Sequence, residues 1–133
     1  MARRPEFRGE QFEKGLQIRR EVLGDGYVDR SVDAATDTTA DLQKLITEWC
    51  WGEIWGRPGL DRRSRSVLNL GMLAALNRPN ELALHMRGAL KNGVTREEIV
   101  EIVLQIAIYC GVPAALDAQK VAQKVFAELD AGA

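Results

Sequence analysis

His85 is the only histidine of the 133-residue chain, and imidazole is the side chain whose ordinary pKa lies nearest to neutral pH. It follows Leu82 by three residues and precedes Ala89 by four, so in a helix it lies along the apolar stripe. At such a position it is either a satisfied core residue or a working acid or base. Glu81, four residues earlier, lies on the same side of that helix and is suited to orient the ring.

A second group of residues surrounds Glu53. Glu53 follows Trp49 by four residues and Ile46 by seven, which places it on the predicted apolar stripe of its helix. A carboxylate that faces inward must be paired or take up a proton. Trp51 and Trp55 flank it and predict a dry wall beside the carboxylate. The alternative is a well-packed helix in which Glu53 forms a salt bridge.

Three arginines, Arg57, Arg78 and Arg87, lie in or near the loops that adjoin these groups. The planar guanidinium is suited to bidentate binding of a carboxylate, so these residues are candidates for binding an anionic substrate. Taken singly, each of them is also consistent with a solvated surface charge.

Other kinds of site find little support. Cys50 and Cys110 are too far apart for a redox motif and are expected to be inert core thiols in a reducing cytoplasm. One histidine cannot build a His cluster, so we expect no metal. The sequence has no phosphate loop, dinucleotide motif or supported Ser-His-Asp triad. A net charge of −1 argues against nucleic-acid binding.

The elements that must position these residues are predicted to be helices in a single all-α domain. Hydrophobic residues make up 46% of the chain and charged residues 28%, an ordinary globular balance. Apolar residues recur at helical spacing, and strand signals are weak. We expect about seven helices, ended by glycine and proline and opened by the cap residues Asp61 and Thr95–Glu98. They are predicted at 9–23, 28–35, 40–55, 61–77, 79–91, 99–109 and along a last stripe from 118 to 129.

Two of these helices are apolar on most faces. Residues 67–76 are therefore expected to be buried at the centre, and the stripe Leu42, Leu45, Ile46 and Trp49 is expected to face inward. So much apolar surface in a small domain indicates either a thick central helix pair or contact with another subunit. Residues 1–10 are predicted to be a flexible arm, and no segment is long enough to span a membrane.

Several segments together resemble the 4-carboxymuconolactone decarboxylase family, of the alkylhydroperoxidase-like superfamily. The resemblance extends over about residues 12–130, which assigns 11–133 to one domain of this family. The most specific parts are the tryptophan-rich stretch and residues 76–90. The resemblance implies an all-α bundle that assembles as a hexamer, a trimer of dimers. The other segments that carry it are 14–24, 57–62, 92–99 and 109–115.

The wider superfamily includes thiol peroxidases with a Cys-x-x-Cys-x-x-x-His motif and a glutamate on the preceding helix. Aligned on His85, this motif puts Arg78 and Glu81 at the two cysteine positions and Ser66 at the glutamate position. The redox groups are missing, which favours the decarboxylase branch. A redox protein of the same fold and a non-catalytic binding module are the remaining alternatives.

The resemblance implies cofactor-free decarboxylation of 4-carboxymuconolactone, an anionic lactone of protocatechuate catabolism, to β-ketoadipate enol-lactone and CO2. The ring double bond and the lactone carbonyl accept the electron pair, so no cofactor is needed as an electron sink. His85 is our first choice for the proton donor, with Glu81 orienting it, and Glu53 is the second. Carboxylate binding falls to the three arginines, with Trp51 and Trp55 beside the leaving carboxylate.

Overall fold

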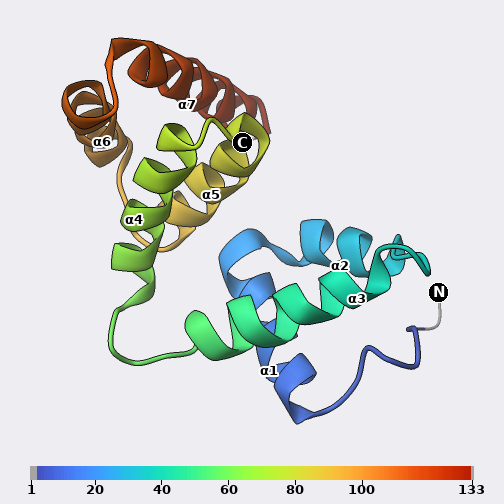
Figure 1. The fold of residues 1–133 in the computed structure, drawn as a ribbon. Coiled ribbons are helices and arrows are strands. Elements are labelled where there is room, and N and C mark those ends of the chain that lie inside the picture. Colours follow the sequence, from blue (N-terminus) through green and yellow to red (C-terminus); the bar gives the residue numbers. More distant parts are fainter. Residues whose placement is uncertain (1–2, 133) are drawn as a thin grey trace. The chain divides into compact units, whose positions relative to one another are not determined.

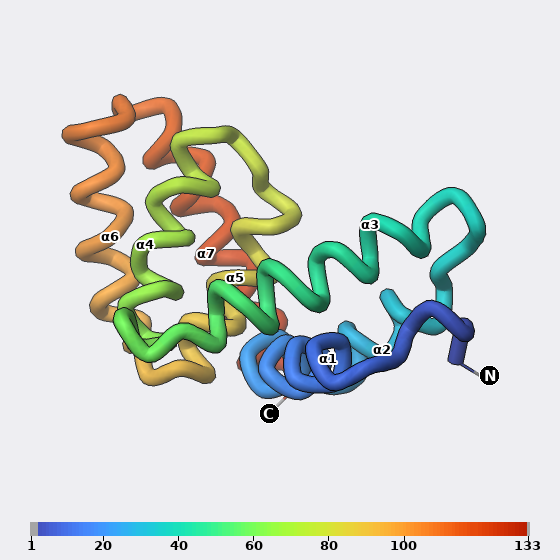
Figure 2. The backbone as a smooth tube through the Cα atoms, turned by 60° about the horizontal axis from the view of Figure 1, so that its bottom comes forward, coloured from blue at the N-terminus to red at the C-terminus, as the bar shows by residue number. Residues whose placement is uncertain are grey.

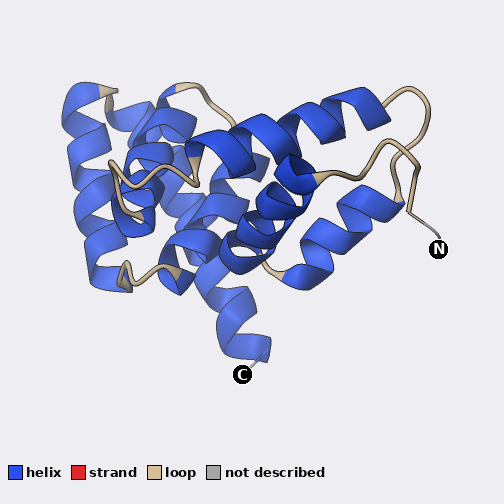
Figure 3. Ribbon diagram, turned by 90° about the horizontal axis from the view of Figure 1, so that it is seen from below, coloured by secondary structure: helices blue, strands red, loops and turns tan. Residues whose placement is uncertain are grey.

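The computed structural model describes residues 3–132, which form helices joined by short loops and contain no strand (Figure 1, Figure 3). The predicted all-α class is confirmed. The contacts divide the chain into two compact units, Met1–Leu60 and Asp61–Ala133, and the assignment of 11–133 to one domain stays a prediction. The boundary follows residues 56–59, a loop with two glycines and a proline. No helix of the described residues has the length and apolar character needed to cross a membrane.

The first unit contains α1 (Glu10–Leu23), α2 (Asp25–Asp33), α3 (Ala40–Leu45) and a π-helical segment, η1 (Ile46–Ile54). Helix α3 and η1 run on as one coil, drawn in green in Figure 1 and as a continuous tube in Figure 2. On α1, Phe12, Leu16 and Val22 are buried. Gly24 ends α1 at a φ of 95° and donates its N–H to the Arg20 carbonyl, as its type predicted.

The expected flexible arm is fixed to this unit at Phe7. The Phe7 side chain is 1% exposed and stacks on Phe12 with a centroid distance of 5.2 Å. Arg4 forms ion pairs with Glu6 and Asp37. Residues 3–9 thus contact the core of the unit through one aromatic side chain, and the flexibility of the arm stays a prediction. Residues 1 and 2 lie outside the described residues.

The buried face of the 40–55 segment differs from the predicted one. Leu42, Leu45 and Trp49 are exposed, Trp49 to 58%. The residues that face inward are Ala40, Thr47, Trp51, Gly52 and Trp55. A Cβ placed on Gly15 of α1 would lie 1.8 Å from the Thr47 carbonyl oxygen. The two helices thus touch where their residues are small. The small side chains that allow this close approach, and not the hydropathy of the segment, decide which face of residues 40–55 is buried.

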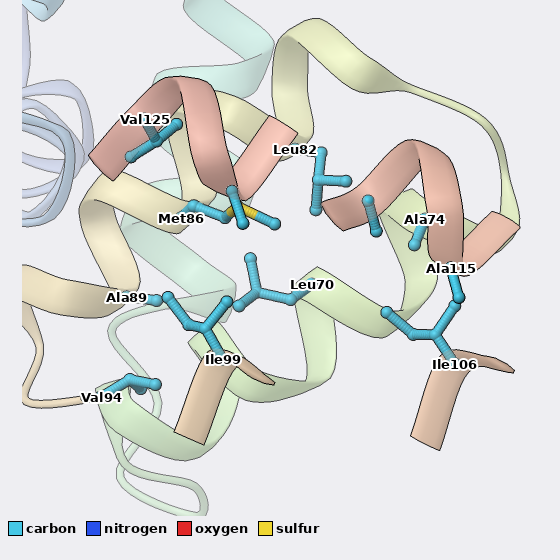
Figure 4. Close-up of a cluster of buried hydrophobic side chains, with 12 residues drawn as sticks. Leu70, Ala74, Leu82, Met86, Ala89, Val94, Ile99, Ile106, Ala115 and Val125 are labelled. Carbon is cyan, nitrogen blue, oxygen red and sulfur yellow. The ribbon is translucent and has the colours of Figure 1, made fainter. Parts of the chain in front are cut away.

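The second unit packs α4 (Arg62–Ala75), α5 (Pro79–Lys91), α6 (Arg96–Tyr109) and α7 (Val112–Gly132) around one hydrophobic core. Figure 4 shows Leu70, Met86 and Ile99 converging there from α4, α5 and α6, with Ile106 beside Ala115 of α7. The predicted caps are confirmed: Asp61 accepts a hydrogen bond from the Ser64 N–H at 2.7 Å, and Thr95 with Glu98 forms a capping box. Pro79 occupies the first turn of α5.

Residues 67–76 of this unit were predicted to be buried at the centre, but helix α4 is only partly buried within the described residues. Leu70 and Ala74 reach the core, whereas Leu68, Met72 and Leu76 are exposed. The neighbouring helices of the unit cover only part of the α4 surface. Leu68 and Met72 line a groove of about 450 Å³ between α4 and α6, together with Tyr109 and Cys110. On α7, Ala118, Ala122 and Val125 are buried as predicted, while Leu129 is 39% exposed.

Candidate functional site

Helix α5 positions His85 by a regular succession of apolar contacts. Leu82, Met86 and Ala89 of this helix are buried in the core of the second unit, as labelled in Figure 4. His85 lies between these residues in the sequence and is itself half-buried, with its Nδ1 atom shielded from solvent. The helix can therefore hold the ring in place through its core contacts while part of the ring stays accessible.

Burial lowers the pKa of the His85 imidazole below its ordinary value, and the nearby Glu81 carboxylate opposes this shift. Glu81 is exposed, one helical turn before His85. The imidazole of the free chain is consequently mostly uncharged at neutral pH. A negatively charged ligand would favour the imidazolium for the same reason that Glu81 does, and this would make His85 a proton donor.

The three arginines have different surroundings. Arg87 forms an ion pair with Glu128 on α7. Arg57 lies 3.5 Å from Glu53 in an ion pair between residues four apart. Arg78 is exposed, immediately before the first residue of α5, and forms no ion pair with the residues that the structure describes. Of the three, Arg78 is the one whose guanidinium has no carboxylate among residues 3–132 to compete with a ligand.

Glu53 does not face inward as predicted. Its side chain is 43% exposed and pairs with Arg57. Trp51 and Trp55 are buried, and their rings stack with a centroid distance of 4.8 Å. They pack with Ile18 and Val22 of α1, so they form a core cluster of the first unit. Glu53 thus follows the alternative that the sequence left open, a packed helix in which this residue forms a salt bridge.

The π-helical segment gives this part of the chain an unusual backbone. The Trp55 N–H donates to the Cys50 carbonyl five residues earlier at 3.0 Å, the spacing that defines a π-turn. The amide of Gln11 on α1 donates to the Glu48 carbonyl at 2.8 Å, and the Thr47 hydroxyl donates to the Gln43 carbonyl at 2.8 Å. Such segments occur often at functional sites; Trp51 lies within this one and Trp55 directly follows it.

Sequence reasoning missed Arg19, a charged residue in the interior of the first unit. It is 4% exposed, and its Nη1 donates to Gln43 Oε1 at 3.0 Å and to Thr47 Oγ1 at 3.2 Å. Burial lowers the pKa of its guanidinium. Its place in the stripe after Phe12 and Leu16 was a signal, because a residue three positions after Leu16 shares its face.

The two cysteines are not core residues, which corrects the expectation for both. Cys50 on η1 and Cys110 at the end of α6 are exposed and unbonded to each other. Partial burial nevertheless raises the pKa of the Cys50 thiol, and the positive charge of Arg19 opposes this shift. Ser66, at the position of the peroxidase glutamate, is buried and accepts a hydrogen bond from Asn92 at 3.0 Å.

Within residues 3–132 no group of three or more acidic, cysteine or histidine side chains is arranged to hold a metal.

Comparison with known proteins points to decarboxylases. Residues 40–124 match the carboxymuconolactone decarboxylase family. The chain is 48% identical over 118 residues to nitrosuccinic acid decarboxylase npaB of Metarhizium robertsii, covering 89% of this chain and 82% of that protein. It is 41% identical over 120 residues to 4-carboxymuconolactone decarboxylase of Acinetobacter baylyi, covering 90% of each.

Proposed function

Because the chain belongs to the carboxymuconolactone decarboxylase family, we propose that it converts 4-carboxymuconolactone to β-ketoadipate enol-lactone and CO2. The observation that carries this proposal is its 41% identity, over 90% of the chain, to a decarboxylase named for that substrate. The chain is a carbon–carbon lyase, and the proposed reaction places it in the catabolism of protocatechuate. A cytoplasmic location is part of the proposal, supported by the two free thiols.

The reaction requires no external electron sink. When the bond between the ring carbon and the leaving carboxylate breaks, its electron pair passes through the ring double bond to the lactone carbonyl as a dienolate. The protein must then bind the negative charges, stabilise the dienolate oxygen and supply one proton to a ring carbon. These are tasks for cationic and acid–base side chains, and we propose that no cofactor takes part.

We propose His85 as the proton donor. Its ring is half-buried on a helix fixed by core contacts, which suits a donor that must be positioned. Glu81 is the positioning residue, because its carboxylate favours the charged ring. Arg78 is the first candidate for binding a substrate carboxylate, and Arg57 and Arg87 would have to exchange their present partners, Glu53 and Glu128. Trp51 and Trp55 form a buried core cluster of the first unit, so the place predicted for them beside the leaving carboxylate is not part of this proposal.

A second candidate function is decarboxylation of nitrosuccinic acid, favoured by the 48% identity to the Metarhizium robertsii enzyme. The carbon that loses CO2 here carries a nitro group, which takes up the electron pair as a nitronate. An assay of CO2 release with each compound distinguishes the two functions. We expect release from 4-carboxymuconolactone, with loss of its ultraviolet absorbance; an inactive chain with this lactone would reject the first proposal.

The pH dependence follows from the lowered pKa of His85. The free chain holds the donor proton only below this pKa, so kcat/KM should fall as the pH rises through a value below the ordinary 6.5. Bound carboxylates favour the imidazolium, so kcat should fall only at a higher pH than kcat/KM does. Steady-state rates between about pH 5 and 9 check this expectation. Identical profiles for the two quantities would contradict it.

Glu53, the second candidate donor, is tested by Glu53→Gln. The Glu53 side chain is 43% exposed and paired with Arg57 on the first unit, so we expect kcat to stay within about threefold of the wild type. The loss of one exposed ion pair should cost less than about 1 kcal/mol of unfolding free energy. A fall in kcat of about 100-fold with unchanged circular dichroism would instead make Glu53 the donor.

We propose that the chain is a homo-oligomer, and the resemblance makes this a hexamer, a trimer of dimers. The support is apolar surface on α4 and α6: Leu68, Met72, Leu104 and Tyr109 are exposed, and Ile108 is 80% exposed. We expect Ile108→Glu to give smaller assemblies with unchanged helical circular dichroism. Sedimentation equilibrium measures this, with Ala127→Glu on α7 as the charge-matched control. A wild-type chain that sediments at 14.8 kDa would contradict the proposal.

A further inference from the structure

We propose that this chain recognises a succinate unit, and that its substrates are 2-substituted succinates whose substituent is a conjugated electron acceptor. The inference rests on the proposed decarboxylase function and names the substrate class of that same site. It makes one prediction that neither candidate function makes alone: the chain should decarboxylate both 4-carboxymuconolactone and nitrosuccinate.

The first step is the chemistry that the two candidate substrates share. In each, the carbon that loses CO2 also carries a CH2–COO⁻ arm, so each contains the four-carbon chain of succinate with both carboxylates. They differ in the acceptor on that carbon, an unsaturated lactone in one and a nitro group in the other. The shared part is a dianion of fixed length, and the variable part is the electron sink.

The bond changes balance in both cases without an oxidant or reductant. The bond from the carboxylate carbon to the succinate C2 breaks, and CO2 leaves. Its electron pair moves onto the lactone as a dienolate or onto the nitro group as a nitronate. One proton then adds to carbon, at the ring carbon beside the carbonyl in the lactone and at C2 itself in the nitro compound, which becomes 3-nitropropanoate.

The second step concerns which arginines of the second unit already form ion pairs with described residues. In the second unit, Arg63, Arg87 and Arg96 pair with Glu98, Glu128 and Asp130. Arg78 is exposed and forms no ion pair with residues that the structure describes. A guanidinium without a carboxylate partner in the chain is suited to bind the carboxylate that the substrate retains.

The third step is the register of Arg78 and His85. Arg78 is the N-cap residue of α5 and precedes His85 by seven residues, a spacing of about 10.5 Å along the helix axis. A long arginine side chain shortens this span towards the length of a small diacid. Arg78 could thus bind the retained carboxylate at one end while His85 faces the reacting carbon at the other.

Two carboxylates on the substrate affect the protonation of His85 more than one does. His85 is half-buried, and burial favours its neutral form, against the effect of Glu81. A dianion beside the ring favours the imidazolium more strongly than a monoanion does. The succinate unit therefore supplies the carboxylate that is bound and the negative charge that favours the protonated form of His85, whichever acceptor the substrate carries.

Four small molecules test the proposal on the full chain: 4-carboxymuconolactone, nitrosuccinate, succinate and glutarate. We expect CO2 release from the first two, with kcat/KM values within about 100-fold of each other. Succinate has no acceptor and should be a competitive inhibitor, while glutarate, longer by one carbon, should inhibit at least tenfold more weakly. Turnover of only one substrate, or equal inhibition by the two diacids, overturns the proposal while one decarboxylase function stands. Turnover of neither rejects the proposed function itself.

The variant Arg78→Gln tests whether Arg78 binds the carboxylate that both substrates retain. It should raise KM for both substrates and Ki for succinate by a common factor of about 10 to 100, the effect of losing a hydrogen bond to a charged group. Arg30→Gln, which removes the charge of an exposed arginine on α2, is the matched control and should leave all three constants unchanged. An Arg78→Gln chain with unchanged KM and Ki values would contradict the assigned role.

Discussion

The His85→Gln variant is expected to lose at least about 100-fold in kcat, the usual effect of removing a positioned acid or base. Glutamine keeps a polar side chain of similar reach but cannot donate the proton of an imidazolium. Because α5 is fixed by Leu82, Met86 and Ala89, the helix should remain intact. Steady-state assays with the lactone, together with circular dichroism, measure the two effects separately.

Nitrosuccinate makes this variant more informative. A nitronate gains its carbon-bound proton slowly in water, so an enzyme without its donor should release CO2 before 3-nitropropanoate forms. Parallel records of CO2 and of the near-ultraviolet nitronate absorbance would show this separation. Glu81→Gln serves as the control: it keeps the donor and should lower the pKa seen in kcat. If His85→Gln turned over at the wild-type rate, the histidine would have no part in the reaction.

The Gly15→Ala variant should cause the largest loss of stability, because its methyl group would meet backbone. The new Cβ would lie 1.8 Å from the Thr47 carbonyl oxygen, so α1 and η1 would have to separate. We expect a loss of roughly 3 kcal/mol, at the upper end of overpacking effects. All three tryptophans belong to this unit, so urea unfolding followed by tryptophan fluorescence reports on it directly.

A matched glycine variant controls for the added methyl group. Gly71 lies inside α4, and a Cβ built there has nothing within 4 Å. Gly71→Ala should therefore be neutral or stabilise the chain by up to about 1 kcal/mol through helix propensity. If Gly15→Ala were as stable as Gly71→Ala, the close contact between α1 and η1 would be wrong.

The features predicted correctly from the sequence are those that depend on neighbouring residues. The Asp61 cap, the Thr95–Glu98 capping box and the Gly24 terminus each follow from local hydrogen bonds and backbone preference. Leu82 and Ala89 are both buried, because their spacing places them on one face of an α-helix, and His85 between them is half-buried.

The features that failed depend on contacts between distant segments. The close approach of Gly15 to Thr47 decided which face of residues 40–55 is buried, and no periodicity shows such a contact. Glu53 was consequently assigned to an inward face that lies partly in solvent. Arg19 was overlooked because a charged residue is ordinarily exposed, whereas here Gln43 and Thr47 satisfy its Nη1 in the interior.

The measurement that tests the central claim most directly is decarboxylation of 4-carboxymuconolactone in D2O, followed by NMR. The claim is that the chain removes CO2 and itself delivers the proton to the ring. It predicts one CO2 for each enol-lactone formed, with a single deuterium at the ring carbon beside the carbonyl on one face only. Deuterium divided equally between both faces, or a lactone left intact, would contradict it.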